Sequence, residues 1–327
     1  MARSQVNRER TQLRVDPWDP EYGASIELES RAPPSVVLDV ETDRWEVGVP
    51  TAPACLPRCA FVDGVRQIDL RLSAEQSELI VPALAGSWAV GSAWAMEPPK
   101  IDHVEVGRVL VVGGGIRLPD LVVRIGGDSL KYPCRSISGR SPIDPIQALQ
   151  NRMRQAEANL ASRIFNSGEA ELLILDGPLT YFSVAGPVVG LIKRQSRAYL
   201  PPERSGILGK LASGTRTPLF GIRDQQLARY SWYVRIASGR PIDGVMTGLV
   251  RLELSMESEI DEAIQLADLT ASILPRFASR IGRDPRAPQN LYPIGRLESV
   301  LRHRLGDRLL LRRSLEAAVW REGTRDI

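Results

Sequence analysis

The chain has 327 residues, of which 43% are hydrophobic and 25% are charged, and its formal net charge is +3. This composition is typical of an ordinary soluble globular protein, and the small positive charge permits a nucleic-acid partner without requiring one. No apolar run is long enough to span a bilayer, and the first ten residues lack the apolar core of a signal peptide. The three cysteines cannot all pair and have no zinc-binding pattern, so we expect a reduced, cytoplasmic protein without a membrane association.

Residues 1–50 are polar, with Pro and Trp scattered among them, and they show no clear period. We interpret this stretch as an N-terminal arm that packs on the body, on a partner or on a second copy of the chain. A partly ordered tail is the alternative. Residues 51–327 are expected to form the main domain.

A series of strands begins this domain, at residues 60–72, 86–95, 104–112 and 121–125. Their short connections predict an antiparallel meander, with the fourth strand extending the same sheet. Residues 68–72 alternate between apolar and polar side chains, which predicts one solvent-exposed face. Asp63 lies at the apolar start of the first strand and is followed by glycine.

A helix is predicted from Asp144, as its cap, to about Phe165, with Pro145 in the first turn. Its apolar stripe consists of Ile146, Leu149, Met153, Ala156, Leu160 and Ile164. Glu157 projects from that stripe or its edge. Since burying a lone carboxylate costs several kcal/mol, Glu157 needs a partner, either a metal ion or an arginine.

A short strand buried on both faces follows at residues 172–176 and ends in Asp176, because Gly177 and Pro178 stop it. The carboxyl ends of such strands are where open α/β sheets place ligands. The next buried strand, around residues 186–192, is followed directly by Lys193 and Arg194. Cations at this position suit phosphate binding, and a solvated loop is the alternative.

Two more strands are predicted near residues 229–236 and 249–254. Trp232 and Tyr233 in the first could stack on nucleic-acid bases, although such residues more often lie in a core or interface. Helices are predicted at residues 259–279, 296–305 and 307–320. In the last pair, Glu298, His303 and Asp307 could reach the site.

This order of elements, with acids on the first strand, the first long helix and the next central strand, resembles the ribonuclease H-like nucleases. We therefore expect an α/β fold, with a ribonuclease H-like mixed sheet flanked by helices and a helical C-terminal part. Such enzymes can use two hard divalent ions about 4 Å apart, which bind carboxylate oxygens.

Within that superfamily, residues 55–315 resemble the NurA nucleases. The motifs are Phe61-Val62-Asp63-Gly64-Val65-Arg66, Leu173-Ile174-Leu175-Asp176-Gly177-Pro178-Leu179, and Tyr292-Pro293-Ile294-Gly295-Arg296-Leu297, together with Glu157 and Lys193. A family histidine would fall near Val300, where this chain has none, so Glu298 or His303 is expected to replace it. Tyr233 is a candidate for a family tyrosine.

The resemblance implies a DNA nuclease that uses Mn²⁺ or Mg²⁺, as two ions, with 5′-to-3′ exonuclease and single-strand endonuclease activity. It also implies a homodimer that processes DNA ends with a HerA-type hexameric ATPase translocase. In this interpretation Asp63, Glu157, Asp176 and Glu298 hold the metal, and Lys193 and His303 complete the catalytic set. DNA contacts are expected from Arg66, Lys193, Arg194, Trp232 and Tyr233. A catalytically inactive, DNA-binding or regulatory subunit of an ATPase complex, or a metal-dependent phosphatase or transferase, are the alternatives.

Overall fold

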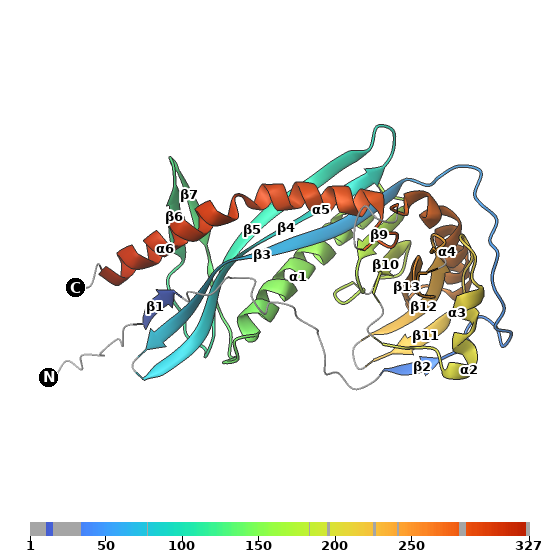
Figure 1. Ribbon diagram of the computed structural model, residues 1–327, viewed down its shortest axis with the longest axis horizontal. Coiled ribbons are helices and arrows are strands. Elements are labelled where there is room, and N and C mark those ends of the chain that lie inside the picture. Colours follow the sequence, from blue (N-terminus) through green and yellow to red (C-terminus); the bar gives the residue numbers. More distant parts are fainter. Residues whose placement is uncertain are drawn as a thin grey trace.

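A computed structural model describes most of the chain (Figure 1). The described residues are 11–15, 34–76, 78–182, 184–194, 197–224, 227–240, 242–280 and 286–324. The described part is elongated, with a two-stranded sheet and the last helix at one end and a group of strands and short helices at the other (Figure 1).

Three long antiparallel strands form the backbone of the molecule. They are β3 (Cys59–Gln76), β4 (Leu79–Ala95) and β5 (Lys100–Val112). Helix α1 (Asp144–Ser167) then crosses to β9 (Leu172–Asp176), which pairs parallel to β3, and β10 (Val188–Ile192) pairs parallel to β9. The resulting order β5-β4-β3-β9-β10 is the ribonuclease H-like arrangement, so the predicted fold class is confirmed.

The main sheet continues on both sides of this core. Its further strands are β11 (Phe220–Arg223), β12 (Ala228–Arg235), β13 (Leu249–Ser255) and β8 (Cys134–Ser136). From the first fifty residues, β1 (Thr11–Val15) pairs with the far end of β3, and β2 (Ser35–Val37) pairs with β11.

The strand predicted at residues 121–125 is present as β6 (Leu121–Ile125), but it does not extend the main sheet. It pairs only with β7 (Asp128–Tyr132), in a separate two-stranded sheet. Gly126 and Gly127 form a tight turn between the two strands, so β6 pairs with β7 as a hairpin and not with a strand of the main sheet.

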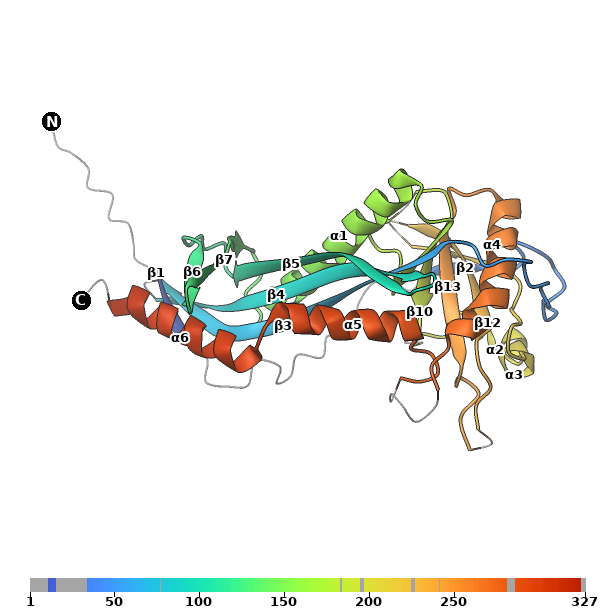
Figure 2. The same ribbon diagram turned by 90° about the horizontal axis from the view of Figure 1, so that it is seen from above.

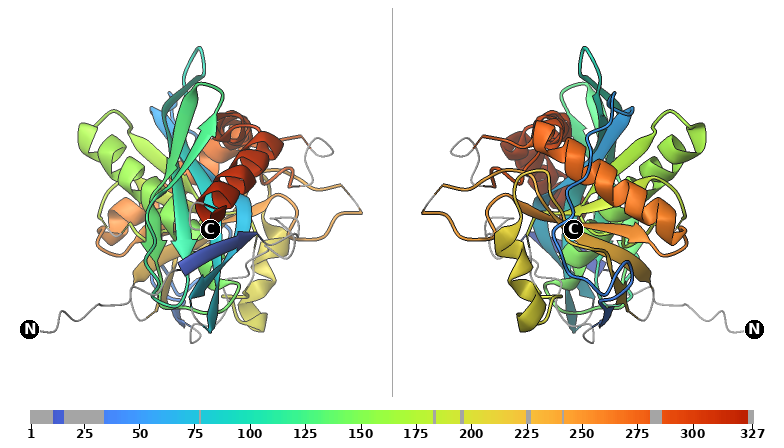
Figure 3. Two further views of the ribbon diagram at one scale, coloured as in Figure 1. Left: turned by 90° about the vertical axis from the view of Figure 1, so that its left-hand side faces the viewer. Right: turned by 90° about the vertical axis from the view of Figure 1, so that its right-hand side faces the viewer.

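Helices cover both faces of the main sheet (Figures 2 and 3). Helix α1 covers one face. The opposite face carries α4 (Ile260–Ile273), the 3₁₀ turn Leu274–Phe277, α5 (Tyr292–Leu305) and α6 (Arg308–Thr324). Two short helices, α2 (Pro202–Ser205) and α3 (Ile207–Lys210), lie near β11 and β12. The predicted helical C-terminal part is therefore confirmed.

The apolar stripe predicted for helix α1 is confirmed, because all six of its side chains are buried. Its start differs in detail from the prediction, because Ile143 is the capping position and Asp144 lies in the first turn. The Asp144 carboxylate instead accepts a hydrogen bond from the backbone N–H of Ser141 at 2.7 Å.

The solvent-exposed face predicted for residues 68–72 is wrong at Asp69, which is fully buried. The pairing of β3 with β4 skips this residue: Ile68 pairs with Gly86, and Leu70 pairs with Ala85. Asp69 is thus the extra residue of a β-bulge. Its carboxylate accepts hydrogen bonds from Gln67, Ser87 and Tyr132, which satisfy it inside the protein.

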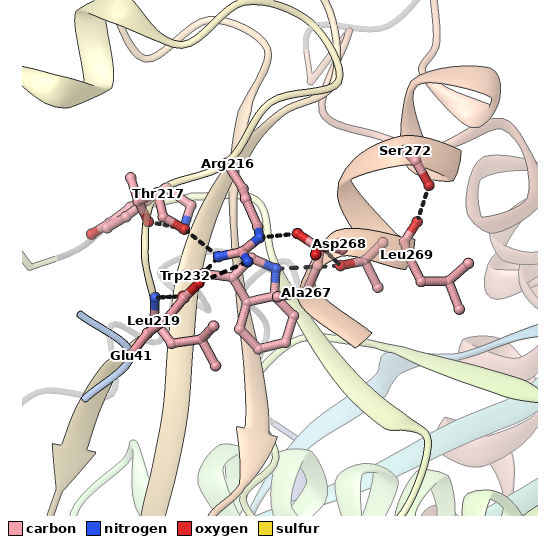
Figure 4. A network of polar contacts seen from close by, with 11 residues as sticks. Glu41, Arg216, Thr217, Leu219, Trp232, Ala267, Asp268, Leu269 and Ser272 are labelled. Carbon is pink, nitrogen blue, oxygen red and sulfur yellow. Dashed lines mark hydrogen bonds and ion pairs between the residues drawn. The ribbon is translucent and has the colours of Figure 1, made fainter. Parts of the chain in front are cut away.

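An arginine ties the segment before β3 to the body of the protein (Figure 4). The buried guanidinium of Arg216 donates to both carboxylate oxygens of Glu41, at 2.8 and 2.9 Å, and to Asp268 of α4 at 2.6 Å. Glu41 also accepts a hydrogen bond from the backbone N–H of Leu219. Bidentate arginine–carboxylate geometry makes this a strong attachment.

None of the helices among the described residues is both long and apolar enough to cross a membrane.

Candidate metal centre

Three candidate site residues lie on or directly after three neighbouring strands of the main sheet. Asp63 on β3, Asp176 at the end of β9 and Lys193 directly after β10 each lie two positions beyond a side chain buried in the core beneath α4 and α5. Side chains two apart on a strand point to the same face. Strand pairing therefore places two carboxylates and one ammonium together, on the face that α5 covers.

Helix α5 adds a third carboxylate to this group. One oxygen from each of Asp63, Asp176 and Glu298 lies within 4.8 Å of the others. Asp63 and Glu298 are buried. The backbone N–H of Gly64 donates to Asp63 Oδ1 at 2.8 Å, whereas the buried Oδ2 has no hydrogen-bond partner in the described structure. Burial, and next the nearby charge of Asp176, raise the pKa of Asp63 well above its ordinary value.

Glu157 approaches the same place from α1, on the other face of the sheet. It is only 8% exposed, which agrees with the prediction that it faces the core. Burial raises its pKa to about 8, with Asp176 raising it further and Arg154 opposing the rise. Glu157 lies outside the set of three carboxylates that converge, although its charge raises the pKa of Asp63.

Gly64 makes this approach sterically possible. A Cβ atom at this position would lie 2.6 Å from Glu157 Oε1 and 3.0 Å from Met153 Cγ. Only a residue without a side chain lets α1 pack this closely against β3. The glycine that follows Asp63 is therefore part of the site, because it allows Glu157 to sit beside the aspartate.

Lys193 is held between two oxygen atoms. Its Nζ lies 2.5 Å from Asp176 Oδ2 and 2.7 Å from Asn290 Oδ1. Asn290 is only 2% exposed and was not predicted from the sequence. It lies in a proline-containing loop without any periodic pattern, so no sequence signal distinguished it from a solvated residue.

A second residue missed by the sequence analysis lies four positions earlier in the same loop. Arg286 donates to both carboxylate oxygens of Glu298, at 2.6 and 2.8 Å. On the α1 side, Arg154 lines a small pocket together with Glu157 and Asp176. The acids are thus accompanied by three cations, one of which the sequence analysis had identified.

A groove runs from Glu298 along the edge of β3. It is lined by Gly64, Val65, Arg66, Gln67, Gln150, Met153, Glu298, Arg302, Leu305 and Arg308. Arg66 is half-buried, and its Nε donates to Gln150 Oε1 at 2.6 Å. The lining of this groove therefore contains one acid, Glu298, and three arginines, Arg66, Arg302 and Arg308.

Three predicted site residues lie elsewhere. Trp232 is fully buried and Tyr233 is 2% exposed, so neither can stack on a base. Strand β12 is central in its part of the sheet, and the Trp232 indole donates to Thr270 Oγ1 of α4 at 3.3 Å. His303 is exposed on α5, five residues after Glu298, and lines a surface hollow away from the acids. Arg194 is exposed directly after Lys193, and its predicted DNA contact stays a prediction.

The donor set fits a divalent cation. All three convergent groups are carboxylates, and hard cations such as Mg²⁺ and Mn²⁺ bind oxygen ligands. The buried Oδ2 of Asp63 has no hydrogen-bond partner among the described residues, and a buried carboxylate oxygen without a donor is costly unless a cation is bound.

Comparisons with known proteins give one structural likeness to report. No family model matches the chain, and no curated protein matches it. Among solved structures, the chain is similar to the NurA nuclease from Sulfolobus solfataricus, with 11% sequence identity and a TM-score of 0.47. The likeness covers 86% of this chain and 88% of that one.

Proposed function

We propose that this protein is a divalent-metal-dependent DNA nuclease. The observation that carries the proposal is the convergence of Asp63, Asp176 and Glu298 around a buried carboxylate oxygen that has no hydrogen-bond partner among the described residues. An adjacent lysine and a groove containing arginines support a phosphodiester as the substrate.

In this proposal Asp63, Asp176 and Glu298 hold the divalent ions, with Glu157 beside them. Bound Mn²⁺ or Mg²⁺ supplies the positive charge that activates a water molecule and stabilises the leaving oxygen. Lys193 donates to the phosphate undergoing cleavage, and Asn290 fixes the direction of its ammonium group. Arg66 and Arg302 in the groove, and Arg194 beside Lys193, contact neighbouring phosphates.

The finer features of the proposal come from the resemblance of the motifs to the NurA nucleases. They are 5′-to-3′ exonuclease and single-strand endonuclease activity, two Mn²⁺ ions, and a homodimer that processes DNA ends with a HerA-type ATPase. The proposed cytoplasmic location comes instead from the number and spacing of the cysteines. In the same proposal, residues 51–327 form the nuclease domain, and residues 1–50 serve as an arm that contacts a partner or the second copy.

The test is cleavage of labelled single- and double-stranded DNA with Mn²⁺, Mg²⁺ or EDTA. We expect metal-dependent cutting that Asp63→Asn and Asp176→Asn abolish while the fold, measured by circular dichroism, is retained. Glu298→Gln and His303→Gln form a matched pair on one helix, of which only the first should lose activity. Full activity in both aspartate variants contradicts the proposal. DNA binding without cutting, even when an ATPase partner is added, would instead favour the inactive DNA-binding subunit.

A further inference from the structure

Arg286 occupies a carboxylate that the proposed function assigns to a metal ion. Its two terminal nitrogens take both oxygens of Glu298, at 2.6 and 2.8 Å. An oxygen of that same carboxylate also lies within 4.8 Å of oxygens of Asp63 and Asp176. A cation that binds all three carboxylates therefore shares Glu298 with Arg286, and the two positive charges repel each other.

The backbone of Arg286 is fixed while its side chain is accessible. The turn that carries it is closed by a hydrogen bond from Asn290 N to Arg286 O at 3.0 Å. Gln289 in the same turn donates to the carbonyl oxygen of Met246, and Ser279 N donates to Pro288 O. The Arg286 side chain itself is 50% exposed. Its guanidinium can thus change partner without movement of the turn.

Lys193 is less exposed than Arg286. The Lys193 side chain is 14% exposed and is held by Asn290 in addition to Asp176. Its amine is positioned whether or not the carboxylate is available. The Arg286 side chain is the more exposed of the two, and its planar guanidinium matches the two non-bridging oxygens of a phosphodiester as well as it matches a carboxylate.

We propose that Arg286 is a displaceable partner of Glu298 that leaves this carboxylate when divalent ions enter and then binds the non-bridging oxygens of the substrate phosphodiester. The inference rests on the proposed metal-dependent function. Before metal binding, Arg286 neutralises part of the negative charge of the acids. After metal binding, the added positive charge weakens its attraction to the centre and releases it for the substrate.

The first measurement is Mn²⁺ binding to the full-length protein, in which electron paramagnetic resonance detects the Mn²⁺ that remains free. We expect Arg286→Gln to tighten Mn²⁺ binding about tenfold, because the metal no longer displaces a bidentate, charge-assisted pair. Arg286→Lys keeps the positive charge but loses the two-pronged guanidinium, so its Mn²⁺ affinity should lie between those of the wild type and Arg286→Gln. Arg296→Gln is the matched control, since it removes the same charge from an exposed position two residues before Glu298.

The second measurement is binding of a fluorescent oligodeoxythymidylate, with Ca²⁺ in place of Mn²⁺ and the strand checked to be intact. Here Arg286→Gln should weaken binding about tenfold relative to Arg296→Gln, so the variant changes the two affinities in opposite directions. Equal or weaker Mn²⁺ binding by Arg286→Gln, in a fold that melts like the wild type, would overturn the inference, because Arg286 would then merely position Glu298. If the wild type and Asp176→Asn both fail to bind Mn²⁺, the metal centre itself is refuted, and the proposed function with it.

Discussion

Replacing Gly64 by alanine tests whether α1 presses Glu157 against β3. The new Cβ atom would lie 2.6 Å from Glu157 Oε1, which is well inside the 3.4 Å at which ordinary contact begins, and it would lie 3.1 Å from Glu157 Cγ. The Glu157 carboxylate must therefore move by most of an ångström or the helix must shift. Overpacking of this kind lowers the free energy of unfolding by about 1–3 kcal/mol. Misplacing a group near the reacting atoms by about 1 Å can cost roughly 10²-fold in rate.

Two assays separate these effects. Urea unfolding followed by tryptophan fluorescence gives the change in stability, and Mn²⁺-dependent DNA cleavage gives the change in rate. Gly206→Ala is the control, because nothing lies within 4 Å of its added Cβ and its backbone is helical, so its stability should be unchanged or raised by about 0.4–1 kcal/mol. In a Glu157→Ala background, Gly64→Ala should cost less than in the wild type. If Gly64→Ala behaves like Gly206→Ala in both assays, the close packing deduced for Glu157 is wrong.

Two further predictions concern charged groups. Because the pKa of Glu157 is raised from 4.5 to about 8, the metal-free native state holds this proton more tightly than the unfolded chain does. The resulting stability is fully present below about pH 4.5 and is lost as the pH rises through 8, by on the order of a few kcal/mol. Urea midpoints in EDTA should therefore fall with pH, and less so in Glu157→Gln; an unchanged slope would contradict the shift. Arg216→Met should cost about 3–5 kcal/mol by leaving Glu41 without its buried partner, and should speed proteolysis of the segment around Glu41. Arg240→Met, which breaks an ion pair at the surface, should lower the free energy of unfolding far less, and equal losses in the two variants would argue against the attachment.

The strands and acids of the core could be predicted because their signals are local. An apolar run that ends in Asp176 and a turn shows both the strand and the position of the carboxylate at its end. Glu157 could be placed because the helical period assigns each residue to a face. In both cases, a contact made across the fold follows from a repeat that is visible within a few residues.

The residues that were missed or misplaced depend on tertiary neighbours. Arg286 and Asn290 lie in a loop, where no period indicates which way a side chain points. Trp232 was an ambiguous aromatic residue, because its sequence does not reveal that strands pair on both sides of β12 and that α4 covers its indole ring. His303 and Glu298 are close in sequence, but their positions on the α5 helix separate them.

The bulge at Asp69 lets one uninterrupted strand serve two different cores. Before the bulge, the even-numbered Ile68 packs with α1, whereas after it the even-numbered Leu70 and Leu72 pack with α6 on the opposite face (Figure 2). Because of this one extra residue, the even-numbered side chains after Asp69 face the opposite side of the sheet from those before it. The alternation of apolar and polar residues in the sequence shows no break at this point. The strand that carries Asp63 is therefore also the structural element that holds the C-terminal helix, and the insertion or loss of a single residue here would exchange inside for outside along the whole far half of β3.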